Sequence, residues 1–154
     1  MKKEDSKNVV KLGFSSMFND IGSEMVTTIL PFFILSLGGG GFFVGLISGL
    51  REGLSSIFKL LGGRFSDKTG KRKEFIFLGY FISAISRMCL FFSSSVIYVT
   101  SLVSLERIGK LRDAPRDAVI AESVSKRGKW FAIHQLMDTS GAIIGTALVI
   151  LLFG

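Results

Sequence analysis

Long apolar stretches separated by short polar connections form the main pattern of this chain. A helix that crosses a bilayer needs about 20 mostly apolar residues. On that basis the pattern predicts five membrane-spanning helices, at residues 9–37, 42–65, 75–92, 96–123 and 130–154. The apolar runs exceed ordinary strands in length and lack their period-two alternation. We therefore expect an all-α polytopic membrane protein, in which short links make consecutive helices antiparallel neighbours.

The composition agrees with helices in lipid. Of the 154 residues, 48% are hydrophobic, with 15 Phe and 18 Gly, and the mean hydropathy is +0.50. Frequent glycine suits membrane helices better than a water-solvated surface. The net charge is +7, but the basic residues alternate with apolar spans and do not gather on one polar face. We therefore expect the lipid bilayer, and not nucleic acid, as a partner.

Lysine and arginine gather in every second connection. Four lie in residues 1–11, five in residues 64–73 and three in residues 126–129, whereas residues 38–41 and 93–95 carry none. Cytoplasmic loops of membrane proteins are enriched in these two residue types. The distribution predicts a cytoplasmic amino terminus, an outer-side end of the chain and location in the cytoplasmic (inner) membrane. No signal-peptide cleavage site is evident, so we expect the leading segment to be retained.

The sequence shows no catalytic motif. It lacks the phosphate-binding loop, the zinc-protease motif and the nucleophile elbow. It has one cysteine, Cys89, and one histidine, His134, too few for a zinc cluster or a disulfide. We therefore expect no enzyme activity, no cofactor and no metal site.

Many polar and ionisable residues lie inside the predicted spans. One such charge at mid-bilayer costs on the order of 3 kcal/mol, so these groups usually face protein or water. Their number favours a water-lined central cavity, whereas structural salt bridges that set helix register are the alternative for Arg51, Arg87 and Lys110. The candidates for lining the cavity are Asn19, Arg51, Glu52, Arg107, Lys110, His134 and Asp138.

Two acids of the first predicted helix are the candidates for proton or cation coupling. Asp20 and Glu24 are four residues apart and therefore share a helical face. Near mid-depth, such a pair can exchange a proton or bind a cation as a cavity opens to alternate sides. His134 and Asp138 have the same spacing, but a hydrogen bond that holds helices together is the favoured role for them. Arg107 is a counter-charge in the cavity or a site for an anionic substrate group.

Glycine and proline suggest where helices approach and bend. Small residues at every fourth position let two membrane helices come close, and this spacing occurs at Gly45, Gly49 and Gly53, and again at Gly141 and Gly145. Proline removes a backbone hydrogen bond and bends a helix. Pro31 and Pro115 are therefore candidate gating elements, with a static kink as the alternative.

The connection between the second and third helices carries a specific pattern, G-x-x-x-D-x-x-G-K-R-K. It contains Gly63, Asp67, Gly70, Lys71 and Arg72. This pattern resembles the signature loop after the second helix of major facilitator superfamily transporters. Three more segments, at residues 18–25, 106–118 and 137–142, resemble one branch of that family in the same order.

This resemblance implies a partial amino-terminal domain, made of the first five helices of a twelve-helix protein. In that family two six-helix halves surround a substrate cavity and rock in alternating access. We therefore expect a fragment whose carboxy-terminal half lies in the same polypeptide or in a split partner. Asp67 would help to close the cytoplasmic side against a helix of that half, and Lys71 would meet Asp113 or Asp117.

The expected function is secondary active transport of a small molecule. The paired acids favour proton-coupled export of a small organic compound. Import of a nutrient or metabolite is the alternative if an anionic substrate group binds Arg107 and Lys110. A non-transporting membrane scaffold that associates through its glycine stripes is the alternative from another class.

Overall fold

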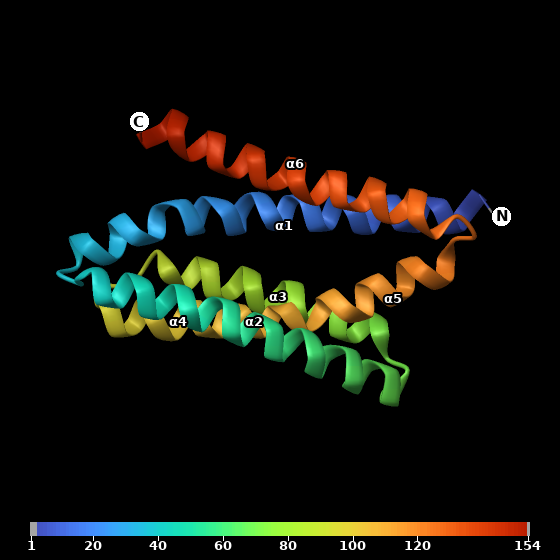
Figure 1. Ribbon diagram of the computed structural model, residues 1–154, viewed down its shortest axis with the longest axis horizontal. Helices are drawn as coiled ribbons and strands as arrows, with labels where there is room; N and C mark the ends of the chain where they lie inside the picture. Colours follow the sequence, from blue (N-terminus) through green and yellow to red (C-terminus); the bar gives the residue numbers. More distant parts are fainter. Residues whose placement is uncertain (1–2, 154) are drawn as a thin grey trace. The chain divides into compact units, whose positions relative to one another are not determined.

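The computed structural model describes residues 3–153, and every regular element in that range is a helix (Figure 1). No strand occurs among the described residues, so the predicted all-α fold is confirmed. Lys2 and Gly154, which the predictions include, lie outside this range. The elements are α1 (Lys3–Ser36), α2 (Gly41–Thr69), α3 (Arg72–Leu90), α4 (Val96–Ile108), the 3₁₀ helix η1 (Gly109–Arg112), α5 (Asp113–Ser123) and α6 (Arg127–Phe153).

The chain divides into two compact units. Unit 1 consists of residues 1–29 and 117–154, and unit 2 consists of residues 30–116. Unit 1 therefore contains α6 with most of α1 and of α5, whereas unit 2 contains α2, α3, α4 and η1. The helices α1 and α5 each run from one unit into the other.

The segment 96–123, expected as one helix, is interrupted. It forms α4, then the 3₁₀ turn η1, then α5. Pro115 lacks the N–H that would bond the carbonyl of Leu111 in a continuous α-helix. A guanidinium nitrogen of Arg112 also donates to the carbonyl of Gly109 at 2.9 Å, which supports the tighter turn.

Glycines of unit 2 let η1 approach its neighbours closely. A Cβ added at Gly62 of α2 would lie 2.1 Å from the carbonyl oxygen of Leu111, and one at Gly79 of α3 would lie 2.5 Å from that of Gly109. These are backbone atoms, which cannot move aside as a flexible side chain can. Only a residue without a side chain therefore fits at either position.

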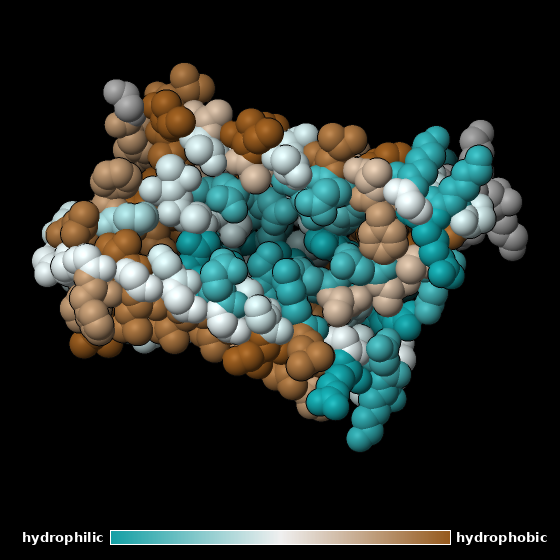
Figure 2. Space-filling view, viewed as in Figure 1, coloured by the Kyte–Doolittle hydropathy of each residue, from teal (hydrophilic) through white to brown (hydrophobic). Residues whose placement is uncertain are grey.

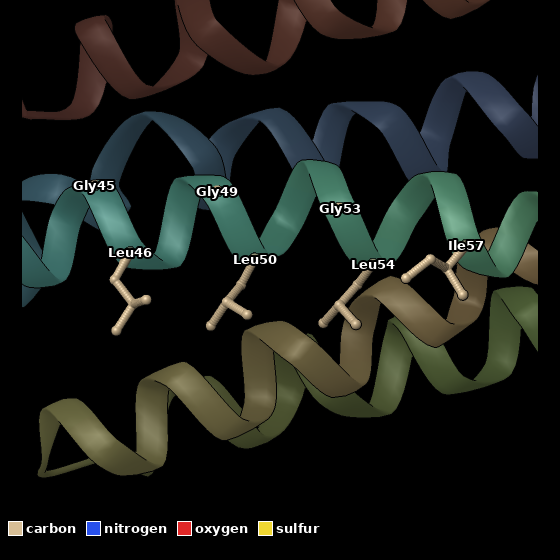
Figure 3. Close-up of a pocket in the computed structure, with 7 residues that line it drawn as sticks. All are labelled: Gly45, Leu46, Gly49, Leu50, Gly53, Leu54 and Ile57. Carbon is tan, nitrogen blue, oxygen red and sulfur yellow. The ribbon is translucent and has the colours of Figure 1, made fainter.

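Among the described residues no other helix packs closely against the glycine stripe of α2, so its predicted role in close packing stays a prediction. Apart from the neighbouring backbone of α2 itself, no described atom lies within 4 Å of a Cβ added at Gly45, Gly49 or Gly53. Together with neighbouring apolar side chains these glycines line a groove of about 380 Å³. Figure 3 shows the apolar side chains of this groove pointing from α2 towards α4. The segment that approaches α2 and α3 closely is η1. It lies beside Gly62 and Gly79, so the close contacts form at these two glycines.

In unit 1, α6 packs along α1 through the second predicted pair of small residues. A Cβ at Gly141 would lie 2.5 Å from the carbonyl oxygen of Met17, and one at Gly145 equally close to that of Ile21. Both helices advance four residues between these contacts, in the same direction, so α1 and α6 run parallel. Beside them, a small apolar cluster joins three elements of the unit. It consists of Val9, Ile120 and Val124, with Leu12, Trp130 and Phe131 packed against it.

Among the described helices, α6 alone is both long and apolar enough to cross a membrane by length and composition. The 13 residues of α4 and the 11 of α5 are each too short to span about 30 Å of hydrocarbon. Figure 2 shows hydrophobic side chains along α6, and hydrophilic side chains at the hairpin between α2 and α3. Membrane crossing by the other segments therefore stays a prediction.

We expect Gly62→Ala to destabilise the protein, whereas Gly49→Ala does not. The added methyl at position 62 would overlap the backbone of Leu111, and overpacking of this kind costs about 1–3 kcal/mol. Position 49 has open space beside it, and alanine favours a helix more than glycine does. Thermal unfolding of the two variants in detergent tests this. Equal melting temperatures for both variants would contradict the packing described here.

Candidate functional site

Glu106 of α4 lies at the centre of a buried ion-pair cluster in unit 2. Its carboxylate pairs with the neighbouring Arg107, and its other oxygen lies 3.9 Å from Nε of Arg87 on α3. Glu106 and Arg107 are each 6% exposed. Burial on this scale is costly for an isolated charge, so the carboxylate and the two guanidinium groups compensate one another. Arg107, predicted to line a cavity, is therefore engaged within the helix bundle.

A second acid, Asp113 at the start of α5, collects cationic side chains from several elements. Its carboxylate lies 3.5 Å from Nζ of Lys59 on α2, 3.6 Å from Nζ of Lys110 and 3.8 Å from Nε of Arg112. Asp113 is buried, whereas Lys59 is exposed at its outer end. Lys110, another predicted cavity residue, is thus part of a salt-bridge cluster. This is the alternative that the sequence left open for it.

Arg112 lies beside Asp113 in the second cluster and was not predicted as a site residue. It is 2% exposed. One guanidinium nitrogen donates to the hydroxyl of Ser83 at 3.0 Å, and the group lies 4.6 Å from the ring centre of Tyr80. The spacing of Gly79, Ser83 and Ser86 on α3, three buried small residues on one face, was a signal that a polar segment packs there.

The adjacent residues Arg51 and Glu52 of α2 differ in exposure. Arg51 is half-buried and Glu52 is exposed, because successive residues of a helix point about 100° apart. The structure therefore does not bring both side chains to one buried site. Their predicted role in lining a cavity stays a prediction.

The predicted coupling residues lie in unit 1. Asp20 and Glu24 are both half-buried on α1, and the side-chain amide of Asn19 donates to Asp20 at 3.2 Å. Glu24 packs against α6. A Cβ added at Gly145 of α6 would lie 3.1 Å from the Cβ of Glu24. Among the described residues, no lysine, arginine or histidine forms a salt bridge with Glu24. This carboxylate thus differs from those of Glu106 and Asp113.

His134 and Asp138 form a separate pair on α6. Nδ1 of His134 lies 3.3 Å from the Asp138 carboxylate, and the histidine is 4% exposed. Gly13 contacts Met137, the residue before Asp138, so this pair lies level with the first turns of α1. Asp20 lies further along α1, about 9 Å in axial rise from residue 14. The structure therefore does not merge the two pairs into one site.

The signature loop is a two-residue turn between α2 and α3. Gly70 has φ of +69°, the left-handed conformation that glycine adopts at helix ends, and its N–H donates to the carbonyl of Ser66 at 2.8 Å. Asp67 accepts from Arg72 at 3.2 Å. At the other end of the pattern, Gly63 of α2 is close to Ala114, whose Cβ lies 3.2 Å from the Cβ position at Gly63.

The expected pairing of Lys71 with Asp113 was wrong. Its ammonium pairs with Glu74 at 3.5 Å and not with Asp113. Asp117 belongs to the other unit, so that pairing stays a prediction. Lys71 is exposed in the turn, whereas Asp113 is buried and already surrounded by Lys59, Lys110 and Arg112. Lys71, directly before α3, and Glu74 in its first turn are only three residues apart, so this pair forms locally.

The two prolines lie next to the boundaries between the compact units. Pro31 follows Leu30, the first residue of unit 2, and Pro115 precedes Arg116, which ends that unit. Pro31 lies inside α1 and Pro115 in the first turn of α5. A role in gating stays a prediction for both.

The sequence also matches a known protein family. Residues 12–154 match the model of the Major Facilitator Superfamily. The chain belongs to this superfamily. A protein named as an uncharacterized MFS-type transporter of Methanocaldococcus jannaschii is 49% identical over 97% of this chain. Multidrug resistance protein MdtH of Blochmanniella pennsylvanica is 30% identical over 86% of it. No solved structure matches the chain.

The chain is shorter than these relatives. It spans 38% of the length of the M. jannaschii protein and 33% of that of the B. pennsylvanica protein. Membership of the superfamily makes this a membrane protein of a transporter family. Its helices correspond to one part of the longer relatives.

We expect Glu106→Gln to lower stability by about 3 kcal/mol, because the change leaves buried guanidinium charge uncompensated. Glu52→Gln, an exposed position on α2, is the matched control and should change stability little. Thermal unfolding in detergent measures both. If the two variants unfold at the same temperature, the Glu106 cluster does not stabilise unit 2.

Proposed function

We propose that this chain is part of a secondary active transporter that exports a small organic molecule by alternating access, driven by protons. Superfamily membership supports transport. The similarity to a multidrug resistance protein supports export. The rest of the transporter would correspond to the part of the longer relatives that this chain does not match.

The observation that carries proton coupling is the state of Glu24. Its carboxylate is half-buried and forms no salt bridge among the described residues, whereas Glu106 and Asp113 are each held by cations. A carboxylate already neutralised by arginine has little tendency to take up a proton. Glu24, with Asp20 one turn away on the same face, is therefore the better candidate for loading and release.

The same comparison argues against import of an anionic substrate. That alternative needs Arg107 and Lys110 to bind the substrate. Arg107 is paired with Glu106, and Lys110 lies beside Asp113, so an anion would have to displace an existing partner. We therefore favour export over import as the proposed direction of transport.

For orientation we propose a cytoplasmic amino terminus in the inner membrane. The turn between α2 and α3 and the start of α6 both carry lysine and arginine, whereas residues 38–41 and 93–95 carry neither. The excess of these residues on one side of the bilayer supports this orientation.

We expect Glu24→Gln and Asp20→Asn each to abolish gradient-driven transport. An amide cannot release a proton in the range where a carboxylate does. Flux through the complete transporter in proteoliposomes, with and without an imposed pH gradient, measures the effect. Both variants should fall to the rate found without a gradient.

Glu122→Gln, an exposed position on α5, is the control for that experiment and should retain coupling. Unchanged gradient dependence in both helix α1 variants would exclude them as proton carriers. Gradient-driven accumulation on the opposite side would indicate import. Absence of flux from the unaltered complete protein would favour a scaffold.

The orientation predicts which positions an impermeant thiol reagent reaches. In a Cys89→Ser background, we expect Ser94→Cys to react in intact cells. Lys73→Cys should react only after the membrane is opened. Both positions are exposed in the structure. The reverse labelling pattern would overturn the proposed orientation.

A further inference from the structure

A groove of about 390 Å³ lies on unit 1, where α1 and α6 run side by side near their amino-terminal ends (Figure 1). We call it the basic groove. All the residues that line it belong to unit 1. They are Lys7, Val10, Lys11, Phe14 and Trp130.

The lining residues divide the groove into a cationic part and an apolar part. Lys7 and Lys11 are exposed and one turn apart on α1. Val10 and Phe14 follow the same spacing, and Phe14, further along the helix, is 49% exposed. Trp130 is half-buried and packs against the small apolar cluster of unit 1. Tryptophan is enriched where a membrane protein meets the headgroup region.

The surrounding charge is also mostly positive. In residues 121–131 the described side chains include Lys126, Arg127 and Lys129, all exposed, and one acid, Glu122. Arg127 donates through Nε to the carbonyl of Ala121 at 3.0 Å. Figure 2 shows hydrophilic side chains at this end of the two helices, and hydrophobic side chains along the far part of α6. Among the described side chains, an anion in the groove therefore meets an excess of cations.

From these features we propose that the basic groove binds an anionic phospholipid. The two ammonium groups would hold the lipid phosphate, and Val10, Phe14 and the Trp130 ring would contact the first part of an acyl chain. A soluble phosphate could use the lysines but would leave the apolar wall exposed. A zwitterionic lipid brings its own cation, which the lysines and their basic neighbours repel. An anionic lipid complements both parts of the groove.

Trp130 is the only tryptophan of this sequence, so its fluorescence reports on the groove directly. The protein is reconstituted in vesicles that contain brominated phosphatidylglycerol or, in parallel, brominated phosphatidylcholine at the same mole fraction. Any tryptophan beyond residue 154 is first replaced by phenylalanine. We expect stronger quenching by the anionic lipid, with a preference of about fivefold for each lysine. Raising the salt concentration should reduce this preference.

The variant Lys7→Gln/Lys11→Gln should quench equally with the two lipids. Lys68→Gln/Lys73→Gln removes the same charge from exposed positions at the turn between α2 and α3, and it should retain the preference. Lys7→Arg/Lys11→Arg should retain it too. Quenching by brominated phosphatidylcholine is the control for the depth of Trp130 in the bilayer. It should be the same in all variants.

Three results would overturn the proposal. The first is equal quenching by the two lipids in the unaltered protein, at low as well as at high salt. The second is equal loss of preference in both glutamine variants, which would indicate a general effect of net charge. The third is loss of the preference when millimolar inorganic phosphate is added, which would indicate a site for a soluble anion.

Discussion

A guanidinium group that is 2% exposed needs partners for its charge, and the surroundings of Arg112 supply several of them. Ser83 and the Gly109 carbonyl accept its hydrogen bonds, Asp113 lies beside it and Tyr80 presents a ring face. These partners come from α3, η1 and α5. Removing one partner would leave a charge in a medium of low polarity, so Arg112 favours the packing of these three segments against one another.

The same requirement explains the close backbone contacts of η1. Arg112 reaches Ser83 only if η1 lies against α3, and Gly79 permits that distance because it has no side chain. Gly62 does the same on α2. The 3₁₀ turn follows from Pro115, which leaves the Leu111 carbonyl without its α-helical donor. Burial of charge, local helix geometry and glycine placement are thus parts of one arrangement.

Unit 1 uses glycine for a different purpose. Gly141 and Gly145 bring the parallel helices α1 and α6 into backbone contact, and this register decides which polar residues share a level. It places Glu24 beside Gly145 and leaves His134 and Asp138 nearer the start of α1. The result is a half-buried carboxylate without a cationic partner among the described residues. That is the feature on which the proposed proton coupling depends.

The sequence alone determined the all-α fold, the family and the separation of basic turns from uncharged ones. These properties are local, since helix formation depends on runs of apolar residues and the signature loop is contiguous. Only the tertiary structure decided which charges neutralise each other. Lys59 and Asp113, or Arg87 and Glu106, are distant in the chain and meet because their helices pack. It also decided that, among the described residues of unit 2, the close contacts form at Gly62 and Gly79 and not at Gly45 or Gly49. The spacing of small residues shows where a helix can be approached, but not which segment approaches it.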